Sequence, residues 1–199
     1  YVFYVFSRCY LHDYPILILS LGYLVIFGIF ALLSSLVSKR LKAKFKKYSQ
    51  VRLSNGLSGK EIAERMLAAH GIVNVKITQV AGSLTDHYNP VNRTVNLSES
   101  VYFGKNAASA AVSAHECGHA VQHATAYSML SLRSKLVPIQ NISGRILNIV
   151  IFFGGFLGVG MNSGVLGLTI IVACYAVLTL FSLVTLPVEF DASKRALKW

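Results

Sequence analysis

The chain has 199 residues, of which 54% are hydrophobic and only 14% are charged, and its 19 basic and 8 acidic side chains give a formal net charge of +11. Soluble domains carry about 25% charged residues and disorder requires low hydrophobicity, so the composition excludes a disordered chain and argues against an ordinary soluble protein. Three cysteines are too few, and odd in number, for a disulfide-built scaffold.

A first membrane span is predicted near the N-terminus. Residues 14–38 carry no charge, and the 23-residue run 15–37 is almost wholly apolar. At about 1.5 Å per residue this run crosses a hydrocarbon core of about 30 Å, and it is too long for the apolar region of a signal peptide. We therefore expect an extracytoplasmic segment over residues 1–14 and a transmembrane helix over residues 15–37.

A water-facing domain is predicted over residues 38–140. Ser58 and Glu61 form the pattern of a capping box, so a helix is expected to follow Ser58 and to end at Gly71. Residues 73–78 and 94–97 alternate as strands do, which predicts a short β-hairpin. The strand over 94–97 could pair with an extended peptide at its edge, or be structural only. A long helix of small residues, capped by Ser98 or Ser100, should then run to about His123.

The motif that carries chemistry lies in this last helix. Residues 115–119 read His-Glu-Cys-Gly-His. Because positions i and i+4 share one helix face, His115 and His119 can reach a single zinc ion, and Glu116 is placed to accept a proton from water rather than to bind the metal. The alternative is a surface helix with two unrelated histidines, which the small, apolar surroundings disfavour.

A second uncharged run covers residues 146–188. Its 43 residues are about twice what one span needs, so we expect transmembrane helices over 146–161 and 165–186, joined by a turn at 162–164. Basic clusters follow the first span, precede the second and follow the third, and the positive-inside rule therefore places 38–140 and 187–199 in the cytoplasm. The positive charge then faces anionic lipid of the bilayer, and no nucleic acid is expected as a partner.

A catalytic zinc ion needs a third protein ligand. A metzincin would carry a third histidine where this chain has Thr125. Glu189 is the best candidate, because the last span returns the chain to the side of the histidines; the alternative is a plain charge at the end of a span. His123 could face the substrate or be an ordinary polar helix residue, and His87 or Tyr88 could stabilise the oxyanion or belong to a plain turn.

Several extended motifs in this order resemble one known family. They are KFKKYSQVR, LTDHYNPVNRTVNLSE, SAHECGHAVQH and LVTLPVEFDASKRAL, and with them the chain resembles the YugP-like family of bacterial neutral zinc membrane metallopeptidases, which is gluzincin-like. The resemblance implies that His115 and His119 bind zinc, that Glu116 is the catalytic base and that Glu189 is the third ligand. Membrane gluzincins commonly carry an aspartate four residues after that glutamate, where this chain has Ser193, so the role of the nearest acid, Asp191, stays open.

The expected molecule is an α+β membrane protein with three transmembrane helices and a small zincin-like domain. Its expected function is that of a zinc-dependent endopeptidase of the bacterial plasma membrane, acting on peptide or protein substrates on the cytoplasmic side, with its last segment cut short at Trp199. One alternative is an intramembrane zinc protease of the site-2 type, although the spans contain no carboxylate. The other is a non-catalytic membrane scaffold with a structural zinc ion, for which Glu116 would be unnecessary.

Overall fold

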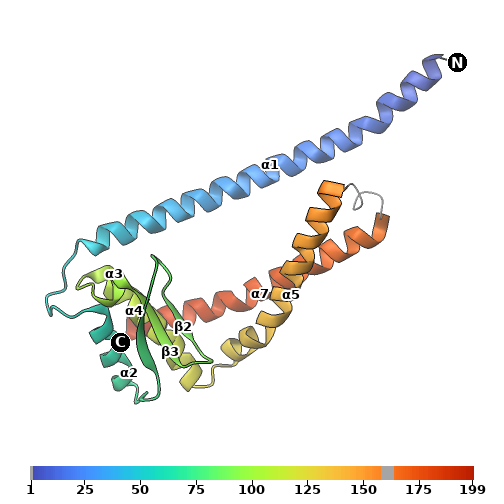
Figure 1. Ribbon diagram of the computed structural model, residues 1–199. Coiled ribbons are helices and arrows are strands. Elements are labelled where there is room, and N and C mark those ends of the chain that lie inside the picture. The colour runs from blue at the N-terminus through green and yellow to red at the C-terminus, as the bar shows by residue number, and fades with distance from the viewer. Residues whose placement is uncertain (1, 158–163) are drawn as a thin grey trace. The chain divides into compact units, whose positions relative to one another are not determined.

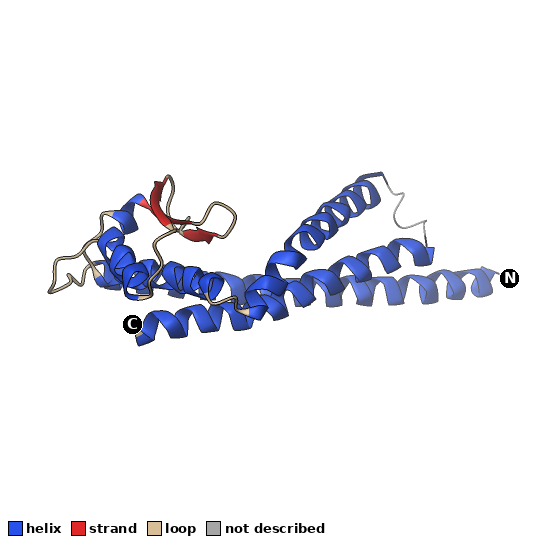
Figure 2. Ribbon diagram, turned by 90° about the horizontal axis from the view of Figure 1, so that it is seen from below, coloured by secondary structure: helices blue, strands red, loops and turns tan. Residues whose placement is uncertain are grey.

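The computed structural model describes residues 2–157 and 164–199 and shows a mostly helical α+β protein with a small mixed sheet (Figure 2). The chain divides into two compact units, Tyr1–Gln50 and Val51–Trp199. The first unit is the helix α1, Val2–Ser49. The second contains the other helices and strands that the structure describes (Figure 1), and the HECGH motif falls within it.

Helix α1 is longer than a bilayer requires. Its 48 residues make about 72 Å of helix at about 1.5 Å per residue, so it continues beyond both ends of the expected span 15–37. The large apolar side chains described between Leu24 and Val37 are all exposed. A lipid-facing helix would show the same surface.

Two helices in the described part of the chain are long and apolar enough to cross a membrane. They are Leu24–Ser49 of α1 and Gly167–Lys198 of α7, and few of their side chains are buried inside the molecule. A signal sequence or the core helix of a soluble protein would meet the same criteria of length and composition. The expected span 146–161 lies partly in helix α5, Ser128–Leu157, while its last residues and the expected turn at 162 and 163 lie outside the described residues.

Helix α2, Gly59–Ala69, begins and ends as its sequence predicts. The Ser58 side chain accepts a hydrogen bond from the main-chain N–H of Glu61, and the Glu61 carboxylate accepts one from the N–H of Ser58 at 2.7 Å, so both halves of the capping box form. Gly71 has φ +67°, and the N–H groups of Gly71 and Ile72 donate to the carbonyls of Ala68 and Leu67. This is the Schellman end that glycine favours.

The sheet corrects the predicted β-hairpin. Its order is β1-β3-β2, where β1 is Lys76–Val80, β2 is His87–Asn89 and β3 is Thr94–Ser98. Strands β1 and β3 are parallel, so they cannot be the two arms of one hairpin; β2, which lies in the stretch expected to be a turn, forms the hairpin with β3. Because β3 is paired on both sides, residues 94–97 offer no free edge to a peptide, and that hypothesis is wrong.

The predicted long helix is in fact two helices. Helix α3, Glu99–Tyr102, stops before Gly104, and helix α4, Ala107–Ala124, begins after Asn106, whose side chain accepts from the N–H of Ser109 at 2.9 Å. The chain leaves the helical path here because the carbonyls of Gly104 and Lys105 accept from the N–H groups of Gly59 and Leu53. Main-chain groups engaged elsewhere cannot continue a helix.

Helix α4 lies at the centre of the second unit. It packs against α2 on one side and against α7, Gly164–Lys198, on another, while α5 runs beside α7 (Figure 1). Met66, Leu97, Val101, Cys117 and Val188 are fully buried where these elements meet. The core therefore joins the HECGH helix directly to the C-terminal helix that carries Glu189.

Candidate metal centre

Two histidines of α4 project to one side of the helix. His115 and His119 are one helical turn apart, and their ring centroids are 4.9 Å apart. Helix α4 is rich in alanine, glycine and serine, and these small side chains allow neighbouring elements to pack closely around the two imidazoles. His119 is buried and His115 is half-buried, so both rings are held within the fold rather than free in solvent.

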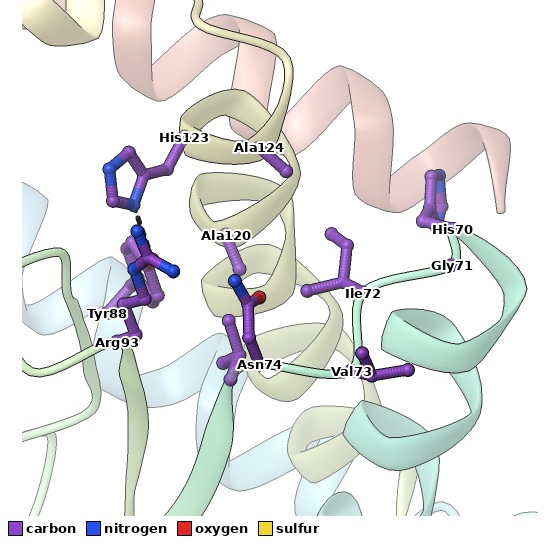
Figure 3. Close-up of a pocket in the computed structure, with 11 residues that line it drawn as sticks. His70, Gly71, Ile72, Val73, Asn74, Tyr88, Arg93, Ala120, His123 and Ala124 are labelled. Atoms are coloured by element: carbon purple, nitrogen blue, oxygen red, sulfur yellow. Dashed lines mark hydrogen bonds between the residues drawn. The ribbon is translucent and has the colours of Figure 1, made fainter.

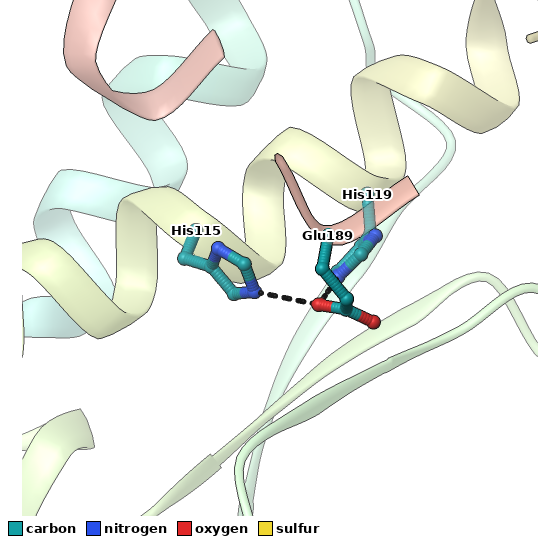
Figure 4. A group of neighbouring side chains, drawn as sticks. All are labelled: His115, His119 and Glu189. Atoms are coloured by element: carbon teal, nitrogen blue, oxygen red, sulfur yellow. Dashed lines mark ion pairs between the residues drawn. The ribbon is translucent and has the colours of Figure 1, made fainter. Parts of the chain in front are cut away.

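Glu189 reaches the two histidines from α7 (Figure 4). Its Oε2 lies 3.3 Å from Nε2 of His115 and 3.3 Å from Nε2 of His119. One ligand atom from each of the three residues can be chosen so that all lie within 4.8 Å of one another. Two imidazole nitrogens and one carboxylate oxygen are the donor set of many catalytic zinc sites, which keep a fourth position for water or substrate, so these three residues fit such an ion.

The other imidazole nitrogens have partners of their own. Nδ1 of His115 lies 3.1 Å from Oγ of Ser193, and Nδ1 of His119 lies 3.0 Å from Oε1 of Gln122. The amide nitrogen of Gln122 donates to the Val188 carbonyl at 2.8 Å and to Asp191 at 2.9 Å. Because the Gln122 amide oxygen can only accept, Nδ1 of His119 carries a proton, and Nε2 is the nitrogen that faces Glu189 and could bind a metal ion.

Charge around Glu189 favours its ionised form. Hydrogen bonds from His115 and His119 hold the pKa of Glu189 well below its ordinary value. Burial alone would lower the pKa of His119, but hydrogen bonds with Glu189 and Gln122 outweigh it and raise that pKa. Arg133 adds a further positive charge, with Nη2 3.9 Å from Oε1 of Glu189. The cluster therefore provides a carboxylate that is ionised at neutral pH.

Glu116 is buried in the same cleft but lies outside the group of three ligand atoms. The cleft has a volume of about 480 Å³, and Glu116, His115, His119 and Glu189 are among the residues that line it. Burial raises the pKa of Glu116, while the neighbouring histidines and the main chain of Tyr88 partly offset this shift. A carboxyl group with a raised pKa can both accept and return a proton near neutral pH.

The four residues that the sequence singled out with less support have three different placements. His87 and Tyr88, on strand β2, line the cleft with Glu116. His123 lines a neighbouring pocket and bonds Tyr88, with the Tyr88 hydroxyl 2.7 Å from Nδ1 of His123. Asp191 accepts from Gln122 and from Arg195 rather than joining the three ligand atoms.

Sequence reasoning missed three residues that support this site. Gln122 lies three residues after His119, and a fully buried glutamine beside a metal motif signals a hydrogen-bonded role. Ser193 lies four residues after Glu189, at the position that we treated only as a departure from the aspartate of gluzincins; the structure places its hydroxyl beside His115. Arg133 left no signal in the sequence, because only the packing of α5 against α7 brings it to Glu189.

Comparison with known proteins places this geometry in context. The family described as "Putative neutral zinc metallopeptidase" matches residues 23–199. A curated protein of Bacillus subtilis (strain 168), described as "Putative membrane protease YugP", is 44% identical over 157 residues, which cover 79% of this chain and 68% of that protein. No solved structure matches the chain.

Proposed function

Because the chain belongs to the family described as "Putative neutral zinc metallopeptidase", we propose that it is a zinc-dependent endopeptidase anchored in a membrane. The observation that carries the proposal is the convergence of His115, His119 and Glu189, with ligand atoms within 4.8 Å of one another, in a cleft that also holds the buried Glu116. His115, His119 and Glu189 are the proposed ligands, and Glu116 is the proposed general base.

The proposed reaction is hydrolysis of a peptide bond. Zinc, when bound, polarises the scissile carbonyl and makes water a stronger nucleophile at neutral pH. Glu116 accepts a proton from the attacking water and returns it to the departing amine, a task that suits a carboxyl group whose pKa is raised by burial. Ser193 and Gln122 hold the two imidazoles in place through their Nδ1 atoms.

Strand β2 is the proposed support for an extended substrate. Among the described residues β2 pairs with no strand other than β3, so no strand covers its other edge, although the main chain of Tyr88 bonds Glu116; His87 and Tyr88 line the cleft. A peptide can add to such an edge as one more strand. This assigns to β2 the role that the sequence suggested for residues 94–97.

The proposed setting is the plasma membrane, crossed by helices over 15–37, 146–161 and 165–186. The apolar surfaces of α1 and α7 support it, as does the description of the Bacillus subtilis relative as a membrane protease. Basic clusters flank the proposed spans on the side of residues 38–140, which favours a cytoplasmic active site. Residues 187–199 then return the third ligand to that side.

The test is the substitution Glu116→Gln in the full chain, purified in detergent and loaded with zinc. We expect cleavage of a fluorescent casein substrate to fall by at least about 10³-fold, because the base is lost, while one zinc ion per chain is retained. His119→Ala is the matched control and should lose both zinc and activity. Full turnover by Glu116→Gln, or undiminished stoichiometric zinc binding by Glu189→Ala, would contradict the proposed roles.

A further inference from the structure

A second pocket adjoins the cleft on the far side of Tyr88. It has a volume of about 540 Å³, and His70, Asn74, Tyr88, Arg93 and His123 are among the residues that line it. Tyr88 also lines the cleft that holds Glu116, so the two spaces share this residue. Figure 3 shows Tyr88, Arg93 and His123 gathered on one side of the pocket, with His70 on the opposite side.

The charged side chain that lines this pocket is basic, and two imidazoles line the pocket with it. None of the described residues that line it is acidic, whereas Arg93 is permanently cationic and His70 and His123 are imidazoles. Within the described part of the chain, Arg93 has no carboxylate within the 4.0 Å of an ion pair, although the chain forms such pairs at Arg133 and Arg195. The Arg93 side chain is exposed, and a guanidinium group that lines a pocket, with no carboxylate beside it among the described residues, can bind an added carboxylate through two hydrogen bonds.

His123 is held so that it can add a second donor. Burial raises the pKa of the Tyr88 hydroxyl, which therefore keeps its proton at neutral pH and can donate to Nδ1 of His123 across 2.7 Å. The same hydroxyl could instead accept from Nδ1–H; in the tautomer whose Nδ1 accepts, the imidazole proton is on Nε2, where it is available to an acceptor. Tyr88 thus positions His123 while its own main chain lies beside Glu116.

The backbone at Arg93 is also unusual. Its φ is +52°, in the left-handed region that glycine and asparagine tolerate better than arginine. The turn holds it there, because Asn89 accepts from the N–H groups of Val91 and Asn92, and the Arg93 carbonyl accepts from the N–H of Lys76 at 3.0 Å. The residue at this position is therefore a long cationic side chain, where asparagine would adopt the same backbone conformation with less strain.

The pocket is within reach of a peptide bound in the cleft. Ala120, His123 and Ala124 form its wall on α4 and follow His119 within about one helical turn. One turn rises about 5.4 Å, whereas an extended peptide advances about 3.3 Å per residue. A substrate residue in this pocket is therefore within about three positions of the bond cleaved at the metal centre.

We propose that this pocket is a specificity subsite that selects peptides bearing a carboxylate at one fixed position within three residues of the scissile bond, with Arg93 as the specificity-determining residue and His123 as a second donor. The inference rests on the proposed peptidase function, which makes a peptide the ligand of this pocket. Its test measures binding and does not require cleavage. The carboxylate is that of an aspartate or glutamate side chain or of the C-terminus of the peptide.

The test measures binding first, so that it does not depend on turnover. The probes are fluorescein-labelled, alanine-rich decapeptides with an amidated C-terminus. Each peptide carries one glutamate at a different position, and a matched series carries glutamine at the same positions. Anisotropy is measured on full-length Glu116→Gln protein loaded with zinc. We expect at least one glutamate peptide to bind about 10- to 100-fold more tightly than its glutamine match, as for a charge-assisted hydrogen bond. Glutamine peptides with a free C-terminus report separately on the terminal carboxylate.

Substitutions at Arg93 then assign the preference. Arg93→Asn removes the charge and tolerates the left-handed backbone, so thermal unfolding should be unchanged while the preference for the carboxylate disappears. Arg93→Lys should retain part of it, and Arg93→Glu should reverse it. On the active protein, mass spectrometry of a cleaved peptide library should show a preference for the same acidic position. In Arg93→Asn this preference should be lost, because KM for the acidic peptide rises while kcat changes little.

The outcomes separate the two proposals. Equal binding of the glutamate and glutamine peptides, for both the side chain and the C-terminus, or a preference that survives in Arg93→Asn and Arg93→Glu, would overturn the subsite while leaving the peptidase untouched. Binding that depends on Arg93, together with a zinc-loaded parent protein (with Glu116 intact) that cleaves no peptide, would support the subsite and contradict the proposed hydrolysis.

Discussion

The orientation of the two imidazoles depends on residues outside the HECGH motif. Ser193, from α7, lies beside Nδ1 of His115, and Gln122, from α4 itself, accepts from Nδ1 of His119. Partners of this kind fix which nitrogen of a metal-binding histidine keeps its lone pair. Gln122 also bonds to Val188 and Asp191, so the helix that supplies Glu189 and the ring of His119 are joined through a single side chain.

Loss of these partners should weaken the metal site without removing a ligand. We expect Gln122→Leu and Ser193→Ala each to reduce zinc affinity by about 10- to 100-fold, measured by competition with a chelating dye. Ser134→Ala is the matched control: Ser134 also lines the cleft, but its hydroxyl bonds the Leu130 carbonyl of its own helix. If all three variants bind zinc like the parent protein, the histidines do not depend on these contacts.

Helices α4 and α7 approach one another closely at one glycine. A Cβ atom placed on Gly118 would meet the Ala192 carbonyl oxygen at 2.5 Å, so the absence of a side chain inside the HECGH motif allows α7 to bring Glu189 over the two histidines. Helix α7 is continuous from Gly164 to Lys198. The position of the carboxylate is therefore set by how this helix packs on α4.

The methyl group added by Gly118→Ala should push α4 and α7 apart. We expect Gly118→Ala to destabilise the protein by about 1–3 kcal/mol, since the clash is with main chain that cannot rotate away, and to lower zinc affinity as Glu189 is displaced. Thermal unfolding in detergent and zinc titration would measure the two effects. Gly144→Ala on α5 has nothing within 4 Å of the new Cβ and should be neutral or slightly stabilising. Equal behaviour of the two variants would show that the close approach is not limiting.

At the scale of the whole molecule, the two compact units have different roles. The proposed ligands, the cleft and the second pocket all belong to Val51–Trp199, whereas Tyr1–Gln50 contributes α1 alone. Helix α7 combines both properties, because its N-terminal part is apolar enough to span a bilayer and its C-terminal part bears Glu189. In the proposed membrane setting, its last turns would hold the metal centre near the membrane surface.

Removal of the first unit should leave the metal centre intact. We expect a protein of residues 51–199 to bind one zinc ion with an affinity within about 3-fold of the full chain, because none of the three proposed ligands is lost. It should still partition into detergent or membranes through α7. Atomic absorption and dye competition on both proteins provide the measurement, and complete loss of zinc from a folded 51–199 protein would show that α1 completes the site.

The direction of the chain in the membrane can be tested by chemical labelling. Val73 is 93% exposed, so an impermeant maleimide should label Val73→Cys in inverted vesicles and not in right-side-out ones, as expected for a cytoplasmic domain. Cys117 and Cys174 are buried and should react little. Cys9 of the parent chain is the internal control, because it should be labelled only from the outside. Labelling of Val73→Cys from the outside would reverse the proposed topology.

The sequence alone determined what depends on local spacing, and the tertiary structure decided what depends on long-range packing. The capping box at Ser58, the glycine end of α2 and the pairing of His115 with His119 follow from residues within four positions of one another, and the structure shows each of them. The proximity of Glu189 was also expected, because the predicted pair of spans would return the chain to the side of the histidines, and its carboxylate lies beside both of them. The parallel pairing of β1 with β3, the break at Gly104 and the partners Gln122, Ser193 and Arg133 could not be predicted in this way. Each depends on contacts between segments that are distant in the sequence. In these contacts, buried polar groups must find hydrogen-bond partners, and this requirement outweighs the local preference of the chain for helix or strand.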